Sequence, residues 1–423
     1  MAIKIFTVFS FLFTLFGFFY FMNTPEPEDF IVPAKTRITI LAGQSTSDAG
    51  VEDMIKEKLS QEFPDIEVEW ESVPWDDFTS AMQAKIASGE DPDLMIGKAL
   101  DVYTYQPRGD LMPLPLVVTK QIQPEGLKAV EIQGEYYGAP YNLMYHGVFY
   151  NRDIFERYNI KIPETIEEMH QTVKKLEAVG ITPFAVHTQE NWAIINLFMQ
   201  FATNCIFVDD PVWGDKFRNG EESFSSSKKA QNCIFEVAYV LNHSWSDAAS
   251  LRQYECDQRF ANGKAAMYIT GSWSLQTIAA VQPTMRVGIF PYPNSSGTAK
   301  LIMEPNLTFM KNARSKNSEL VDQMLSSIFS DETLAEDIYH FTKSVPLRKG
   351  ISALPQQGME NDILLYKKRK QVIDATISNR QLLWPYQNKL AEKINLWTVG
   401  KLSFSNILQY ADEQRMKSGR LLK

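Results

Sequence analysis

The chain has 423 residues, of which 44% are hydrophobic and 12% aromatic, and its formal net charge is −9. This length predicts more than one domain, and the composition is that of a globular protein rather than a disordered one. The net charge is negative and is spread without long acidic blocks. This balance argues against a nucleic-acid partner, which needs a concentrated basic face, and is compatible with a soluble protein that binds a neutral ligand.

The N-terminal segment, residues 1–23, has one lysine, Lys4, followed by an uninterrupted apolar run from Ile5 to Met22. As a helix this run would be roughly 27 Å long, just enough to cross the hydrocarbon core of a bilayer. It ends in aromatic residues and has no small-residue cleavage site, so we expect a membrane-spanning signal anchor with the body of the protein outside. A cleaved signal peptide is the alternative. Residues 24–35, which include three prolines, are expected to be a linker.

Strands and helices alternate in the next part of the chain. Strands are predicted at residues 36–41, 66–71 and 94–96, and helices at 51–63 and 76–88. This order predicts a parallel sheet with helices on its faces, and ligands of such sheets bind at the carboxyl edge of the strands. The candidate ligand-binding residues here are Gln44, Asp93, Lys98 and Asp101. A turn or capping bond at the start of a strand is the competing role for Asp93.

The stretch from Gly134 to Gly180 organises the rest of the chain. Turns and aromatic-rich extended segments are followed by a short helix at 154–158. Thr165 and Glu168 form a predicted capping box for the next helix, which Gly180 ends. Further strands are predicted at 181–186, 287–290 and 301–310, and further helices at 193–202, 230–241 and 320–329.

Several motifs in this part resemble a known family. They are G-x-x-Y-G-x-P-Y at 134–141, Y-N-R-D-x-F at 150–155, I-P-E-T at 162–165, and F-x-x-G-x-A-A-M at 260–267 followed by Gly271-Ser272-Trp273. Together they resemble the extracellular solute-binding proteins of ABC transporters, in the cluster that binds sugars and oligosaccharides. The resemblance covers nearly everything after Thr36. The chain departs from some of these proteins at Gly97, where an aromatic residue can occur.

The resemblance implies an α/β, two-lobed fold of the type II periplasmic-binding-protein kind, in which each lobe is a mostly parallel sheet flanked by helices. The chain would pass between the lobes three times. Lobe 1 would comprise residues 36–141 and 291–343, and lobe 2 would comprise residues 142–290 and 344–423.

Sugar recognition needs flat apolar faces and groups that bond to hydroxyls. Trp273 is the best aromatic candidate, because in the family the tryptophan after the glycine often faces the sugar. Trp192 follows a strand end in the same way, and Trp384 is expected in a loop between helices. The polar candidates in lobe 2 are Gln189 and Glu190. Further candidates at the crossings between the lobes are Tyr141, Glu304 and Arg348. Packing at the hinge is the alternative role for Tyr141, and an ion pair across the hinge is the alternative for Arg348.

Signals for catalysis are weak. The five histidines are scattered, and the chain has no H-E-x-x-H, no G-x-S-x-G and no phosphate-binding glycine loop. The three cysteines, Cys205, Cys233 and Cys256, do not have the spacing of metal ligands. The sequence is compatible with one disulfide between two of them and with three free thiols. We therefore expect no enzyme, no cofactor and no metal.

The resemblance implies a monomeric receptor on the outer face of the membrane. It would capture a carbohydrate by hinge closure and deliver it to the permease subunits of an ABC importer. The chain lacks the cysteine that carries a lipid anchor in many such proteins, which leaves open a role in sensing for a membrane signalling protein. A surface enzyme that processes glycosides is a further alternative.

Overall fold

Ten strands form one mixed sheet in the computed structural model, which describes residues 35–44, 49–75, 77–351, 358–375 and 380–419. The strand order is β2-β1-β3-β10-β6-β8-β7; β9 and β11 pair with β6, and β12 pairs with β10. The strands are β1 (Thr36–Gln44), β2 (Ile66–Pro74), β3 (Leu94–Gly97), β6 (Ala139–Asn151), β7 (Thr182–Ala185), β8 (Ala265–Gly271), β9 (Val287–Phe290), β10 (Leu301–Lys311), β11 (Val345–Pro346) and β12 (Val372–Asp374). A separate small sheet pairs β4 (Glu131–Ile132) with β5 (Glu135–Tyr136).

The strand directions differ from the expectation of a mostly parallel sheet in each lobe. Near the two ends of the sheet, β1 runs parallel to β3 and β7 runs parallel to β8. In the centre, β10 is antiparallel to both β3 and β6, and β6 is antiparallel to β8. The reason is that β10 returns from the later part of the chain and inserts between two earlier strands. Every residue of β6 is buried, because strands cover it along its whole length.

Most of the principal helices occupy the intervals between the strands, and α18 and α19 follow the last strand. They are α2 (Ala49–Glu62), α3 (Phe78–Ser88), α4 (Asp101–Tyr105), α5 (Leu116–Thr119), α6 (Pro124–Lys128), α7 (Arg152–Arg157), α8 (Ile166–Ala178), α9 (Asn191–Ala202), α10 (Trp213–Asn219), α11 (Lys228–Asn242), α12 (Gln253–Ala261), α13 (Leu275–Val281), α14 (Ser318–Ser330), α15 (Glu332–Thr342), α16 (Glu360–Lys368), α18 (Trp384–Thr398) and α19 (Phe404–Glu413). Short 3₁₀ turns lie at 106–108 and 272–274, and a π-helical turn lies at 203–207.

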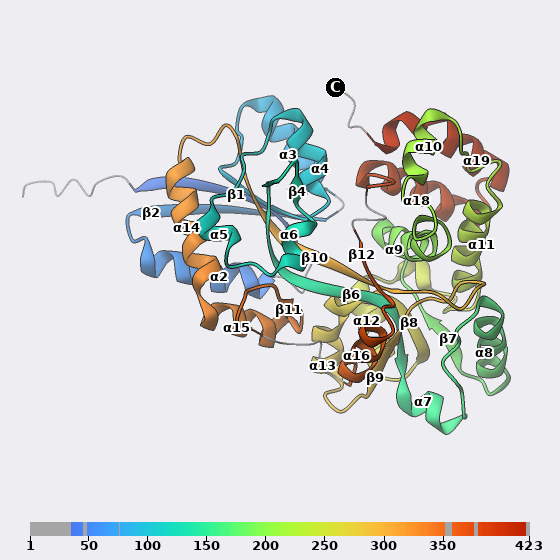
Figure 1. The fold of residues 1–423 in the computed structure, drawn as a ribbon. Coiled ribbons are helices and arrows are strands. Elements are labelled where there is room, and N and C mark those ends of the chain that lie inside the picture. Colours follow the sequence, from blue (N-terminus) through green and yellow to red (C-terminus); the bar gives the residue numbers. More distant parts are fainter. Residues whose placement is uncertain (1–34, 45–48, 76, 352–357, 376–379, 420–423) are drawn as a thin grey trace, which may run out of the picture. The chain divides into compact units, whose positions relative to one another are not determined.

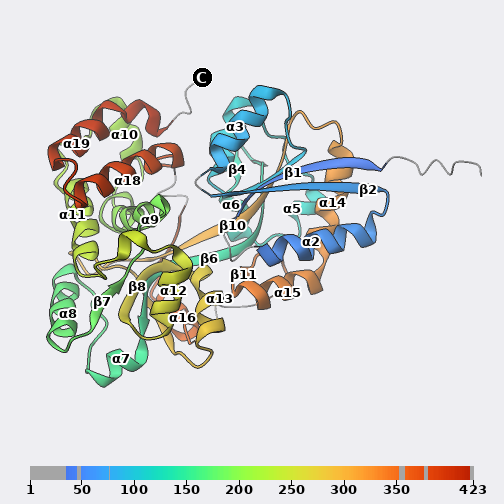
Figure 2. The ribbon, with the colours of Figure 1, turned by 180° about the vertical axis from the view of Figure 1, so that it is seen from behind.

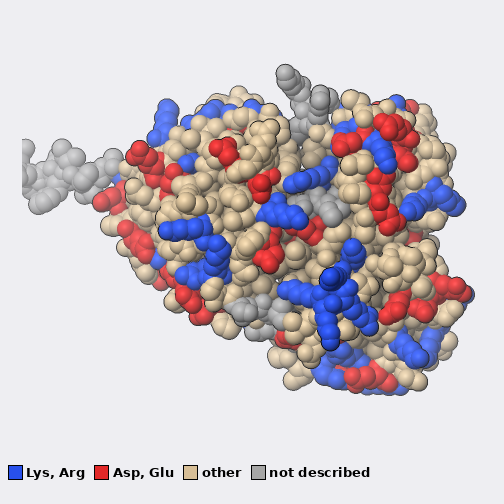
Figure 3. Space-filling model, in the orientation of Figure 1, with Lys and Arg blue, Asp and Glu red and all other residues tan. Residues whose placement is uncertain are grey.

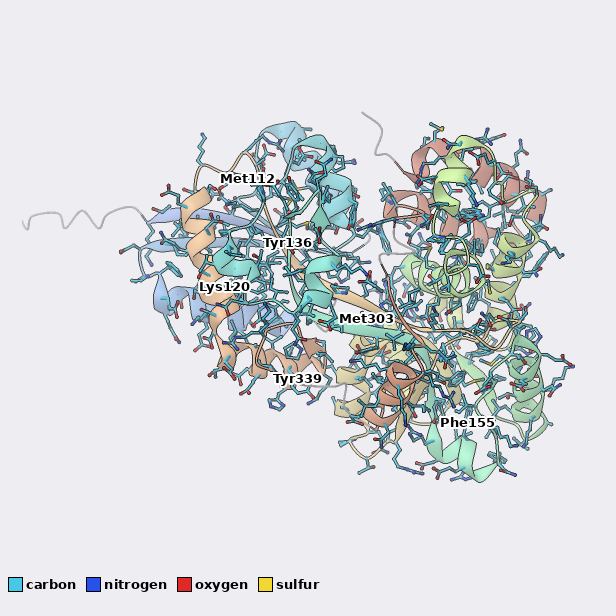
Figure 4. The ribbon with its side chains drawn as sticks, viewed as in Figure 1. Met112, Lys120, Tyr136, Phe155, Met303 and Tyr339 are labelled. Atoms are coloured by element: carbon cyan, nitrogen blue, oxygen red, sulfur yellow. The ribbon has the colours of Figure 1, made fainter. Side chains whose placement is uncertain are left out.

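Residues 37–423 form one compact unit. Within it, Figure 1 and Figure 2 show two groups of elements joined by the long strands β6 and β10. We call them the β1 group (β1–β3 with α2–α5, α14 and α15) and the β7 group (β7–β9 with α7–α13, α16, α18 and α19). Helices α14 and α15 pack on α2, whereas α9 packs on α11 and α18. Met303 lies on β10 where that strand passes between the groups (Figure 4), and it pairs with Tyr145 of β6.

Local sequence explains where α8 begins and ends. Thr165 accepts a hydrogen bond from the backbone N–H of Glu168, and the Glu168 carboxylate accepts one from the Thr165 N–H, which confirms the predicted capping box. At the other end the backbone turns at Gly180, whose φ of 75° is in the left-handed region that glycine adopts without strain.

The predicted signal anchor at residues 1–23 and the linker up to Ala34 lie outside the described residues. Among the residues that the structure describes, none of the helices has an apolar stretch long enough to span a membrane.

Candidate functional site

A cleft with a volume of about 940 Å³ lies between the β1 group and the β7 group, and residues from both groups line it. Seven of the predicted site residues are among the lining residues: Lys98, Gln189, Glu190, Trp192, Trp273, Glu304 and Trp384. They come from parts of the sequence that are almost 300 residues apart, and the fold brings them to one cavity.

Two tryptophans form an aromatic wall on the side of the β7 group. Trp192 lies in the first turn of α9, and its ring centroid is 6.0 Å from that of Trp273 in an edge-on arrangement. Trp273 is also edge-on to His146 of β6, with ring centroids 4.9 Å apart. Trp273 follows β8 closely because Gly271, which has no side chain, leaves the space that the indole ring occupies. Among the described residues, no acceptor reaches the buried Nε1 of Trp273.

Acidic side chains lie beside this wall. The Glu304 carboxylate lies 2.9 Å from Nε2 of His146, so the two side chains are paired across β10 and β6. Glu190 accepts a hydrogen bond from the backbone N–H of Gln253, and its carboxylate is 3.5 Å from Nδ1 of His187. Burial lowers the pKa of His187 to about 3, so this imidazole is neutral at physiological pH. Both carboxylates are thus held in place by the protein at the surface of the cleft.

A second aromatic surface lies where Lys98 meets two tryptophans. The Lys98 ammonium is 3.5 Å from the centroid of the Trp384 ring and 5.4 Å from that of Trp75, which is within the range of cation–π attraction. Trp384 is the first residue of α18 rather than part of a loop, because Pro385 behind it is favourable in the first turn of a helix. The ring of Trp75 packs against Gly43, as the ring of Trp273 packs against Gly271, and in both cases a side chain on the glycine would collide with the ring.

Asp257 is a buried acid that also borders the cleft. Burial raises the pKa of Asp257 to about 8, so its carboxyl group is mostly protonated near neutral pH. It accepts a hydrogen bond of 3.3 Å from the Gln253 side chain. In its neutral form a carboxyl group can both donate and accept hydrogen bonds, as a sugar hydroxyl does.

Four other predicted residues lie away from the cleft, and each has a structural role. Asp93 accepts bonds from the backbone N–H and hydroxyl of Thr39, and from the side chains of Ser315 and Asn317. Asp101 is buried and accepts a bond from the Lys98 N–H, and burial raises its pKa to about 6.

The other two residues are Tyr141 and Arg348. Tyr141 packs on Phe309 and Phe329 and borders a separate apolar hollow of about 20 Å³. Arg348 bonds to Glu332 and to two backbone carbonyls. These contacts give Asp93, Tyr141 and Arg348 structural partners outside the cleft. Gln44 ends β1, and its side chain lies outside the described part of the chain.

Several lining residues were not among the predicted site residues. They are His146, Asn196, Gln200, Arg252, Gln253 and Asp257. A signal existed for two of them: Asn196 and Gln200 are amides one turn apart in the largely apolar helix α9. Their side chains bond to each other and to the carbonyls of Ile269 and Thr270, which attaches α9 to β8. The others come together only through the fold. In the described residues, no group of three histidine, cysteine or acidic side chains is arranged to hold a metal ion.

Comparisons with known proteins agree with this geometry. The multiple sugar-binding protein of Streptococcus mutans is 23% identical over 293 residues, which cover 67% of this chain and 68% of that protein. The melibiose/raffinose/stachyose-binding protein MelE of Bacillus subtilis is 25% identical over 269 residues, which cover 62% of each chain. The solved structure of a sugar transporter from Bacillus licheniformis in complex with stachyose has a TM-score of 0.77 over 90% of this chain and 99% of that one, at 14% identity, and so shares its fold.

The family model of bacterial extracellular solute-binding proteins matches residues 42–334, well over half of the chain. The solved relatives have the same α/β architecture, in which a mixed sheet is flanked by helices. The resemblance inferred from the motifs is thereby confirmed, and the chain belongs to the bacterial extracellular solute-binding protein family.

Proposed function

We propose that this protein is the receptor of an ABC importer and captures an oligosaccharide in the cleft between the β1 and β7 groups. The observation that carries the proposal is the pair of aromatic surfaces, one at Trp192 and Trp273 and one at Trp75 and Trp384, in a single cavity with carboxylates and amides. Indole rings stack on the C–H faces of sugars, and the acids and amides bond to hydroxyl groups.

The size of the cleft supports an oligosaccharide over a single sugar unit. Its volume of about 940 Å³ is near the upper end of the range of small-molecule sites, which is roughly 300–1,000 Å³. Two aromatic surfaces also offer separate stacking positions for different sugar units. The names of the relatives point the same way, since MelE is described as binding melibiose, raffinose and stachyose.

Transport follows from closure around the ligand. We propose that the β1 and β7 groups are the two lobes, with boundaries near residues 141, 290 and 343, and that they rotate about β6 and β10. A ligand that contacts both groups stabilises the closed form, and this difference in affinity is what drives closure. The closed form would be the one that a permease recognises.

The family places the protein outside the cytoplasm. We propose further that residues 1–23 anchor it in the membrane and that it acts as a monomer. N-terminal sequencing of the membrane-bound protein tests the anchor: a first residue beyond Met22 contradicts it. Size-exclusion chromatography with light scattering tests the monomer.

The function itself is tested by thermal shift against melibiose, raffinose, stachyose and maltotriose, with amino acids and polyamines as the contrasting panel. A ligand at about 100 times its Kd stabilises the native state by roughly 2.7 kcal/mol. At about 1 °C per kcal/mol for a chain of this size, the expected rise in Tm is about 3 °C.

Trp192→Leu and Trp273→Leu should reduce this shift. The matched control is Trp397→Leu, because Trp397 is half-buried and packs on Phe235 and Phe404 away from the cleft. A panel in which only amino acids or polyamines raise the Tm would overturn the proposal.

A further inference from the structure

Helix α16 presents an apolar face to solvent as well as to the protein. Met359, Ile363 and Tyr366 point into the core and are buried. On the outer side, Leu364 is 50% exposed and Leu365 is 43% exposed. Two neighbouring leucines on an open helix face are unusual for a solvated helix, where polar residues are expected on the outer side.

Four consecutive basic residues follow these leucines: Lys367, Lys368, Arg369 and Lys370, all of them exposed. Leu364 and Lys368 are four residues apart, so the apolar and basic side chains lie next to each other on one helix face. Figure 3 shows basic side chains gathered over the part of the surface where Figure 1 places α16.

Among the residues that the structure describes, interactions within the protein account for only part of this charge. Arg369 has Glu164 at 3.5 Å, and both side chains are exposed, so this pair is weak. The Lys367 ammonium lies 5.7 Å from the centroid of the Tyr145 ring. Lys370 has a φ of 56°, a left-handed position after the helix end where glycine is favoured. The backbone therefore gives no reason for a lysine at this position.

We propose that the α16 patch, which consists of Leu364, Leu365, Lys367, Lys368, Arg369 and Lys370, binds the surface of an anionic phospholipid bilayer. Apolar side chains beside a basic cluster fit such a surface, because the leucines enter the interface while the basic groups lie among the phosphates. The net charge of the chain is −9, so the rest of the protein is repelled by an anionic surface and contact occurs through this patch. A water-soluble acidic partner could form ion pairs with the basic side chains, but it would leave the two leucines exposed to water.

The test uses the full-length protein with an environment-sensitive fluorophore on Asn361→Cys. Asn361 is exposed and lies one turn before Leu364 and Leu365, so the label reports on the patch without replacing any of its residues. The labelled protein is mixed with vesicles of phosphatidylglycerol or of phosphatidylcholine that contain a lipid-borne quencher. Because the signal is local to α16, an N-terminal membrane anchor does not produce it. The unmodified chain, labelled in parallel, gives the background from its natural cysteines.

We expect at least twofold quenching with phosphatidylglycerol, less than a fifth of that effect with phosphatidylcholine, and a loss of quenching as the salt concentration rises. Replacing Lys367, Lys368 and Lys370 with glutamine should remove most of the quenching, and so should replacing Leu364 and Leu365 with serine.

The matched control replaces the exposed residues Lys120, Lys174 and Lys264 with glutamine, which changes the net charge equally at sites outside the α16 patch. Lys120, for example, directly follows α5 in the β1 group (Figure 4). The control variant should be quenched as strongly as the parent. Absence of quenching with phosphatidylglycerol, equal quenching with both lipids, or an equal loss in the control variant would overturn the proposal. Loss in the lysine variant without loss in the serine variant would also overturn it, because this outcome indicates a purely ionic contact rather than insertion into a bilayer.

Discussion

Replacing Gly271 with alanine should weaken ligand binding by moving the Trp273 ring. A Cβ atom at residue 271 would lie 2.1 Å from Cζ3 and 2.5 Å from Cε3 of that indole. The backbone at Gly271, with φ −127° and ψ 173°, is extended and accepts alanine without strain. The conflict is therefore between the new methyl group and the ring, which must move by about 1.4 Å to reach a carbon–carbon contact distance of about 3.5 Å.

The size of the effect follows from this displacement. An aromatic contact contributes roughly 0.5–1.5 kcal/mol beyond its buried area. A gap of 0.5–1 Å already removes about a quarter to a half of the dispersion energy of a contact, so a movement of about 1.4 Å removes more. The Kd of the sugar should rise about two- to tenfold in Gly271→Ala, and about tenfold or more in Trp273→Leu, where the ring is absent.

Isothermal titration calorimetry with the sugar that gives the largest thermal shift measures these values. The double variant Gly271→Ala/Trp273→Leu supplies the decisive comparison. If alanine acts through the ring, it adds little to a protein that has already lost the ring. An equal loss of affinity from Gly271→Ala with and without Trp273 would refute the reasoning, as would unchanged affinity in the single variant.

Three further predictions concern acidic residues. Asp93→Ala should lower the free energy of unfolding by about 3 kcal/mol or more in urea denaturation, because it leaves four donors without their acceptor. The Kd for the sugar should not change. A higher Kd with normal stability would show that Asp93 contacts the ligand. Glu304→Gln should raise the Kd about tenfold with little change in Tm, since a charged acceptor beside His146 is lost; calorimetry that finds no change contradicts its role in binding. Burial raises the pKa of Asp257, so the native state favours the protonated form and loses stability as pH rises from about 4 to about 8. The difference in Tm between the neutral variant Asp257→Asn and the parent should therefore be smallest near pH 4 and grow in favour of the variant up to pH 8, and parallel curves for the two proteins would show that Asp257 ionises normally.

The sequence was most informative where short-range rules apply. The helix cap at Thr165, strand β9 at Val287–Phe290 and the position of Trp273 after β8 all follow from local patterns. Strand direction was less accessible, because the position of β10 between β3 and β6 depends on contacts between residues far apart in the chain.

The same limit separates the site residues that were found from those that were missed. Asp93 and Lys98 both flank β3, and local rules treat them alike as polar residues at a strand end. Only the fold shows that Asp93 bonds to Thr39 and Asn317, whereas Lys98 reaches the cleft. The fold also explains why residue 97 is a glycine. A Cβ atom there would lie 2.6 Å from a carboxylate oxygen of Asp101, so an aromatic residue at this position does not fit this protein.

The position of β10 has a consequence for the order in which the molecule is built. Strands β3 and β6 lie on either side of a gap that only residues 301–311 fill, so neither group of elements is complete until the ribosome has passed Lys311. Nascent chains that emerge before that point expose two unpaired strand edges, which are sites of aggregation. A polypeptide with this topology therefore cannot complete its fold during most of its synthesis. An unfolded chain is the form that an export channel can move across a membrane.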